Sequence, residues 1–255
     1  MRVIVTRPQP QADAWVAGLA AAGLDAVALP LIEIAAAADP APLAAAWNEL
    51  AAIDLAVFVS PNAAERFFAA RPANLPWPAC TLAAAPGPGT ARLLRELGVP
   101  ADWLAEPPAD APSFDSESLW PVLAARRDWR SARVLVVRGD GGRDWLGATL
   151  RAHGASVEQL AAYRRLAPAF DAGQRALLDA ALRPAGGHVW LFSSSEAIDN
   201  LHAATCAAAP DWTCARAVTT HPRIAQRARH LGFGAVFEAA PSLPAVVACL
   251  QSTAT

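Results

Sequence analysis

The chain opens with Arg2-Val-Ile-Val-Thr-Arg7, and the same pattern returns as Arg133-Val-Leu-Val-Val-Arg138. Each copy is followed by a helix-forming segment and then, at the same offset, by a glycine, Gly23 or Gly154. Short β-branched runs that alternate with Ala- and Leu-rich segments are typical of parallel sheets covered by helices. The repeated pattern therefore predicts two similar α/β units.

The rest of the chain continues this alternation of strands and helices. The predicted strand cores are Val3–Thr6, Leu55–Ser60, Thr81–Ala85, Val134–Arg138, Val189–Ser193, Ala217–Thr220 and Ala235–Glu238. Several of the intervening helices end in a glycine, which adopts the left-handed conformation easily and turns the chain back towards the next strand. These glycines are Gly23, Gly98, Gly154 and Gly232.

Two extended stretches, Ala26–Ala36 and Ser156–Ala167, are each about twice the usual strand length of about 5 to 6 residues. Strands of that length can leave one domain and enter another. We therefore predict a central domain inserted into an outer one, with the two long strands as a double linker that permits hinge closure. The predicted ranges are 1–35 plus 168–255 for the outer domain, 38–160 for the inserted domain, and about 26–37 and 156–167 for the linker.

The composition is that of a folded globular protein, with 54% apolar and 17% charged residues in a chain of 255. A formal net charge of −2 provides no basic field for nucleic acid. The four cysteines lack metal-site spacing, which predicts buried free thiols and no metal site. The sequence shows neither a signal peptide nor an apolar run long enough for a membrane span, so we expect a cytoplasmic protein without membrane partners.

Small polar and basic residues gather where the predicted strands end. Helix N-termini point outward at the carboxyl ends of parallel strands, and their backbone N–H groups bind carboxylates or phosphates. The candidate binding residues are Thr6, Arg7, Ser60, Asn62, Thr90, Arg138, Gly139, Gly141, Gly142, Arg143, Ser193, Ser194, Ser195, Thr220 and His221. The structural alternative for the Ser, Thr and Asn residues is an ordinary helix N-cap.

The segment Arg138-Gly-Asp-Gly-Gly-Arg143 is a candidate anion site of its own. Its three glycines let the backbone approach a ligand, and two guanidinium groups flank the turn. The segment lacks the spacing of a dinucleotide or nucleoside triphosphate fingerprint, which argues against an NAD- or nucleotide-dependent enzyme. Ser194 and Ser195 lie outside a GxSxG motif, which argues against a hydrolase.

Two residues are further candidates for chemistry. His221 follows a predicted strand, whereas the other histidines stand in helices or at strand entries. Tyr163 is the only tyrosine of the chain and lies on one of the predicted linker strands. Its alternative interpretation is a packed ring with an exposed hydroxyl.

Five segments of the chain occur in the order of the signature blocks of one enzyme family. They are Val59-Ser-Pro-Asn-Ala63, Gly87-Pro-Gly-Thr-Ala91, Val137-Arg-Gly-Asp-Gly-Gly-Arg143 running on to Ala162-Tyr-Arg-Arg165, Phe192-Ser-Ser-Ser-Glu196 and the segment from Arg223 to Phe233. With the inserted-domain layout, they make the chain resemble the uroporphyrinogen-III synthases. The resemblance implies an α/β protein of two flavodoxin-like parallel-sheet domains, one inserted in the other and joined by a two-stranded linker.

The resemblance also implies a reaction. Members of the family close hydroxymethylbilane to uroporphyrinogen III in tetrapyrrole biosynthesis, with loss of water and inversion of ring D, and they use no metal or organic cofactor. Tyr163 is then the candidate catalytic acid for the departing hydroxyl. The polar strand ends are expected to hold the eight carboxylates of the substrate in a cleft between the domains.

Two further expectations concern the partners of the protein and a function other than catalysis. We expect a monomer that binds a small-molecule substrate and makes at most transient contacts with neighbouring pathway enzymes. The alternative is a hinged two-domain binding protein for a polyanionic small molecule that performs no chemistry.

Overall fold

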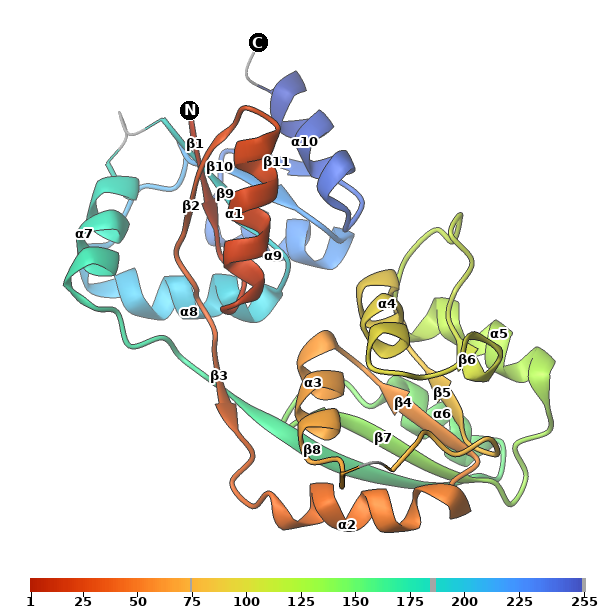
Figure 1. Cartoon of the computed structure of the whole chain (residues 1–255). Helices are drawn as coiled ribbons and strands as arrows, with labels where there is room; N and C mark the ends of the chain where they lie inside the picture. Colours follow the sequence, from red (N-terminus) through yellow and green to blue (C-terminus); the bar gives the residue numbers. More distant parts are fainter. Residues whose placement is uncertain (74, 184–186, 254–255) are drawn as a thin grey trace. The chain divides into compact units, whose positions relative to one another are not determined.

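The computed structural model describes residues 1–73, 75–183 and 187–253. The chain divides into two compact units (Figure 1). The first unit combines Met1–Ile34 with Leu166–Thr255, and the second unit is Ala35–Arg165. The second unit is contiguous in sequence, so it is an insertion in the first.

The first unit is built on a five-stranded parallel sheet with the order β11-β10-β9-β1-β2. Its strands are β1 (Arg2–Val5), β2 (Asp25–Ala28), β9 (His188–Phe192), β10 (Arg216–Thr219) and β11 (Ala235–Glu238). Its helices are α1 (Gln11–Ala21), α7 (Ala172–Ala181), α8 (Ser195–Thr205), α9 (Pro222–Leu231) and α10 (Leu243–Ser252).

Successive side chains of a strand point to opposite faces, so β1 contributes to two separate cores. Val3 and Val5 lie in one core with Leu19 of α1 and Leu250 of α10. Ile4 lies in the other core, which is closed by apolar residues of α7, α8 and α9. Figure 1 shows α1 and α10 together beside this sheet. Helices therefore cover both faces, as expected for a parallel sheet of nearly continuous apolar strands.

The second unit contains a six-stranded sheet with the order β3-β8-β7-β4-β5-β6. Its strands are β3 (Glu33–Ala36), β4 (Leu55–Phe58), β5 (Leu82–Ala84), β6 (Leu104–Ala105), β7 (Arg133–Gly139) and β8 (Ser156–Leu166). Its helices are α2 (Ala41–Glu49), α3 (Pro61–Ala69), α4 (Pro88–Glu96), α5 (Ser116–Arg126) and α6 (Trp145–Ala152). The strands from β8 to β6 pair in parallel.

This second sheet is also covered on both faces. On one face, Leu119 of α5 and Leu150 of α6 lie in a core with Val57 of β4. On the other face, Trp47 of α2 stacks on Phe67 of α3 with ring centroids 4.8 Å apart. Each unit thus has a buried core of its own.

The predicted fold class is confirmed, because both units are α/β with mostly parallel sheets. The glycines predicted at helix ends have positive φ angles, for example +78° at Gly23 and +108° at Gly232. One prediction is wrong: Ala26–Ala36 is not a single strand but divides into β2 and β3, which belong to different sheets. The break contains Pro30, which has no N–H to donate to a ladder, and Leu29 and Leu31 on either side are fully buried.

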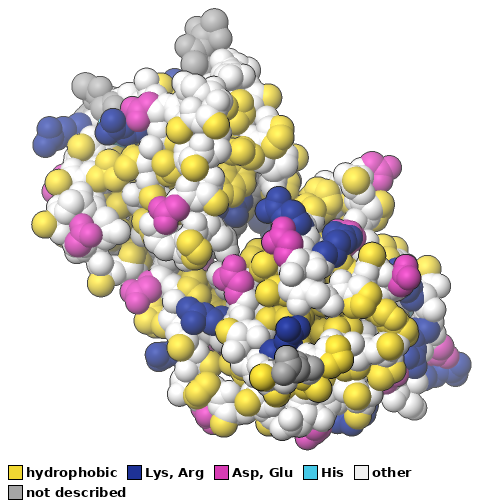
Figure 2. All heavy atoms as spheres, viewed as in Figure 1, with side chains coloured by type: hydrophobic (Ala, Val, Ile, Leu, Met, Phe, Trp, Pro, Cys, Tyr) yellow, Lys and Arg dark blue, Asp and Glu magenta, His cyan; other side chains and the backbone are white. Residues whose placement is uncertain are grey.

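Charged side chains are distributed over the face drawn in Figure 2, where arginines alternate with acidic residues. This agrees with a net charge of −2. Within the described residues, no helix is long and apolar enough to cross a membrane.

Candidate active site

The candidate residues lie where strands end and helices begin. In the second unit, β4 leads into α3 and β5 into α4; in the first unit, β9 leads into α8 and β10 into α9. Three of these helices have a proline at their first position. Proline suits this position because its missing N–H would have no partner within the helix. These residues are Pro61, Pro88 and Pro222. Because the strands are parallel, the helix N-termini of each unit gather at one edge of its sheet.

Ser60, Ser194 and His221 are the N-caps of their helices, which the structural alternative predicted for the serines but not for His221, whose alternative was an ordinary turn residue. Ser60 Oγ accepts a hydrogen bond from the backbone N–H of Ala63 at 3.2 Å. His221 Nδ1 accepts one from the N–H of Arg223 at 3.1 Å. Ser194 is the N-cap of α8, but its side chain makes no capping bond. The first-turn amides of α8 therefore lack a side-chain acceptor from their own cap.

The other hydroxyl and amide candidates differ in exposure. Thr6 is buried and donates to the carbonyl of Leu191 at 2.7 Å, which ties the ends of β1 and β9 together. Asn62, Thr90 and Thr220 are also buried. Ser193, Ser194 and Ser195 remain half-buried at the end of β9. The three serines are therefore more accessible than the buried candidates.

Arg7 stands out among the basic residues at these edges. Its guanidinium carbon lies 4.3 Å from the centroid of the Trp15 ring. Its Nε is buried without a hydrogen-bond partner, and the described part of the chain provides no ion pair to it. Burial lowers the pKa of Arg7 to about 10, so the side chain is still protonated at neutral pH. An unpaired, partly desolvated cation of this kind is suited to an anionic ligand.

The glycine-rich loop uses its arginines internally. Arg138 donates to the carbonyl of Gly141 at 2.8 Å and to Gln159 Oε1 at 3.1 Å, and only 8% of its surface is exposed. Arg143 pairs with Glu117. The two guanidinium groups predicted to face a ligand thus have partners within the second unit.

Gly139 is needed for a different reason from the one predicted. A Cβ at this position would lie 3.0 Å from Cε2 and Cζ of Tyr163. Gly139 therefore lets a buried ring approach the backbone, rather than a ligand. Gly141 has open space at the corresponding point, and Gly142 has a φ of +108°.

Tyr163 is fully buried, and its hydroxyl is bonded rather than exposed. The phenol oxygen lies 3.1 Å from Ser60 Oγ and accepts from Arg165 Nη2 at 3.4 Å. The ring is packed, as the alternative interpretation predicted. The hydroxyl is buried and hydrogen-bonded, so the predicted exposure of the hydroxyl is wrong. The structure brings together three of the predicted residues, Ser60, Gly139 and Tyr163.

A family model described as uroporphyrinogen-III synthase HemD matches residues 13–248, which include most of both units.

The chain belongs to the uroporphyrinogen-III synthase family.

Named relatives agree with this assignment. The uroporphyrinogen-III synthase of Salmonella typhimurium is 29% identical over 241 residues, which cover 91% of this chain and 92% of the relative. That of Proteus mirabilis is 32% identical over 171 residues, which cover 65% of this chain and 81% of the relative. Membership makes the chain an enzyme, a cyclising lyase of tetrapyrrole biosynthesis that acts on a small molecule.

Solved structures of the family share the fold. A mutant uroporphyrinogen III synthase of Thermus thermophilus superposes with a TM-score of 0.63 at 20% identity, covering 100% of this chain and 97% of that one. A uroporphyrinogen-III synthetase of Helicobacter pylori gives a TM-score of 0.58 at 18% identity, covering 99% and 100%. At such low identity the likeness supports the fold alone.

Two residues that contact the candidates were not selected by reasoning from the sequence, Arg165 beside Tyr163 and Trp15 beside Arg7. Arg165 was identifiable, because residues two apart on a strand share a face and Tyr163 was already a candidate. Trp15 gave no signal, since its contact with Arg7 depends on how α1 packs against the end of β1. Neither belongs to a recognisable binding motif by itself.

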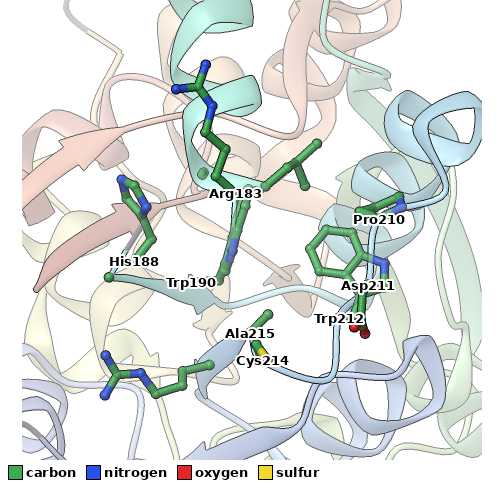
Figure 3. A pocket seen from close by; sticks show the side chains of 12 residues that line it. Arg183, His188, Trp190, Pro210, Asp211, Trp212, Cys214 and Ala215 are labelled. Atoms are coloured by element: carbon green, nitrogen blue, oxygen red, sulfur yellow. The ribbon is translucent and has the colours of Figure 1, made fainter. Parts of the chain in front are cut away.

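A small cavity lies away from these strand ends. It has a volume of about 90 Å³ and is lined by residues of the first unit that include Trp190, Trp212, Arg183 and His188 (Figure 3). His188 begins β9, so this cavity lies at the amino edge of the sheet. Burial, and secondarily Arg2, lowers the pKa of His188. The cavity is too small for a linear tetrapyrrole and is separate from the candidate active site.

Proposed function

We propose that the chain converts hydroxymethylbilane to uroporphyrinogen III, with loss of water and inversion of ring D. The observation that carries the proposal is the family match over residues 13–248. The hydrogen-bonded pair Ser60 and Tyr163 at the strand ends supports it, because the reaction requires a proton for the departing hydroxyl.

The carboxylates of the substrate require donors that do not depend on a strongly basic surface. Arg7, partly desolvated and stacked on Trp15, is the cation best placed to bind one of them. Helix N-termini offer further N–H groups, and α8 is the clearest example because Ser194 does not cap it. We therefore assign the recognition of carboxylates to the carboxyl edges of the two sheets.

The proposed reaction has three stages. Tyr163 is the source of the proton that allows the ring A hydroxyl to leave as water, which produces an azafulvene. The substituted α-carbon of ring D attacks this azafulvene and gives a spiro-pyrrolenine. The spiro intermediate fragments and recloses at the free α-carbon of ring D, which loses its proton. Positioning dominates, because the free bilane closes spontaneously to the uninverted isomer.

We also propose that the enzyme acts as a monomer in the cytoplasm, where neighbouring pathway enzymes contact it only transiently. The four cysteines are free thiols, but Cys80, Cys206 and Cys214 are exposed, so the prediction that the thiols are buried is wrong. Free thiols are typical of a reducing compartment.

The test is incubation of the protein with freshly prepared hydroxymethylbilane, followed by oxidation and separation of the uroporphyrin isomers. Type III product is expected, in excess over the type I isomer that forms in buffer alone. A product consisting only of type I would contradict the proposed function and would leave a non-catalytic binding protein as the alternative.

A further inference from the structure

We infer that Ser60 donates the proton to the leaving hydroxyl. Tyr163 acts through Ser60: it positions the Ser60 hydroxyl and resupplies its proton. This inference rests on the proposed function and adds a catalytic residue to it.

Tyr163 and Ser60 differ in burial. None of the Tyr163 surface is exposed, whereas Ser60 is half-buried at the end of β4. The two oxygens are 3.1 Å apart. A ligand at the carboxyl edge of the sheet can therefore reach Ser60 Oγ, whereas the phenol lies behind it.

The hydrogen bonds of Tyr163 and Ser60 run in one direction. The phenol oxygen of Tyr163 accepts from Arg165 Nη2 at 3.4 Å. Its own proton needs an acceptor because the group is buried, and within the described residues Ser60 Oγ is the one in range. Ser60 Oγ then accepts from Tyr163 and from the N–H of Ala63, which leaves its own proton to point outward.

The ring of Tyr163 crosses the end of a neighbouring strand to reach Ser60. Strand β7 lies between β8, which carries Tyr163, and β4, which leads to Ser60. Gly139 ends β7 and is paired with Tyr163. The ring contacts the backbone at this position, where a Cβ would approach Cζ to 3.0 Å. The absence of a side chain at Gly139 is what allows the phenol to reach Ser60.

Protons are conserved in the transfer from Tyr163 through Ser60 to the leaving hydroxyl. The Oγ–H bond of Ser60 breaks as the proton joins the departing hydroxyl, the C–O bond of ring A breaks, and water leaves. Ser60 recovers a proton from the phenol of Tyr163, whose oxygen lies 3.4 Å from Arg165 Nη2. The proton lost from the α-carbon of ring D at ring closure returns along the same path, so no external acid or base is consumed.

The first test is a double-mutant cycle on kcat for type III product. Ser60→Ala is expected to lower kcat by about 100-fold with little change in KM, and Tyr163→Phe by about tenfold. The double variant should be no slower than Ser60→Ala alone, because Tyr163 acts only through Ser60. Ser60→Thr keeps the hydroxyl and should recover most of the activity.

A matched control separates catalysis from helix capping. Ser242 caps α10 through the same type of bond, from the N–H of Ala245 to its Oγ at 3.4 Å. Ser242→Ala should lose a similar amount of stability but keep the wild-type kcat. Multiplicative losses in the Ser60 and Tyr163 cycle, or a Ser60→Ala enzyme as active as Ser242→Ala, would overturn the inference.

The second test uses the single tyrosine of the chain. Biosynthetic replacement of tyrosine by a fluorinated tyrosine labels Tyr163 alone and makes its phenol a stronger acid. The ¹⁹F resonance should shift in Ser60→Ala and not in Ser242→Ala. The basic limb of the kcat–pH profile should move to lower pH, and an unmoved profile would contradict a proton-donating role for Tyr163.

The two proposals fail in different ways. Wild-type protein that forms only type I product contradicts the proposed function itself. Wild-type protein that forms type III product, with full activity in a folded Ser60→Ala variant, contradicts the relay alone.

Discussion

At the scale of single residues, Arg7 has the most direct consequence for function. It is a half-buried cation with a stacked aromatic partner but, in the described residues, no carboxylate. Burial lowers its pKa to about 10, so both the folded and the unfolded states are charged at neutral pH. The cost of desolvating this charge is therefore present at every pH below about 10.

We predict that Arg7→Met stabilises the protein and weakens substrate binding. Removal of the partly desolvated charge stabilises the folded state, whereas loss of the contact with Trp15 destabilises it. The net effect should raise the free energy of unfolding by about 1 kcal/mol. Loss of a charge-assisted hydrogen bond to a carboxylate should raise KM about tenfold. Thermal unfolding and steady-state kinetics check the two effects.

Arg130→Met is the matched control for this prediction. Arg130 is exposed and pairs with Asp128 on the surface, so its loss should change stability by less than about 0.5 kcal/mol and leave KM unaltered. An Arg7→Met variant with unchanged KM would remove Arg7 from the substrate site.

Reasoning from the sequence selected residues that the structure brings together, but it did not predict their contacts. Ser60, Gly139 and Tyr163 were all selected, because polar and glycine residues at strand ends are informative. Their mutual contacts could not be predicted, since they depend on β7 lying between β4 and β8. The arginines of the glycine-rich loop were expected to face a ligand, yet Arg138 is bonded within its own loop.

At the scale of helices and strands, glycines fix how elements meet. Gly234 precedes β11, and a Cβ there would lie 1.8 Å from the backbone carbonyl oxygen of Thr213. Gly89 in α4 has no atom within 4 Å of the corresponding point. The two positions therefore differ in packing although both are glycine.

We predict that Gly234→Ala lowers the free energy of unfolding by about 3 kcal/mol, because a backbone carbonyl cannot rotate away as a side chain can. Gly89→Ala should be neutral or should stabilise α4 by up to about 1 kcal/mol. Chemical denaturation measures both. Equal midpoints for the two variants would show that the approach of Gly234 to Thr213 is not a constraint.

Element boundaries also mark the limits of prediction. The strand cores and helix-terminal glycines were predictable from β-branched runs and Gly positions. The division of Ala26–Ala36 was not, because its apolar residues continue through Pro30 while the chain changes from β2 to β3. The two-residue strand β6 gives no periodic signal at all.

At the scale of the whole molecule, the repeated opening pattern is the informative feature. Arg2–Val5 and Arg133–Gly139 form β1 and β7, which lie inside their respective sheets with a parallel neighbour on each side. Each sheet has its own core, and each presents helix N-termini at its carboxyl edge. The fold was therefore predictable from a repeat, whereas the reaction required the family match.

The central claim is that the enzyme inverts ring D, and isotope labelling tests it directly. Hydroxymethylbilane is labelled with ¹³C at both the carbon that bridges rings C and D and the ring D carbon bonded to it. Inversion breaks this bond, so the product formed by the enzyme should lose the one-bond ¹³C–¹³C coupling in its NMR spectrum. A product that retains the coupling would have closed without inversion and would contradict the account.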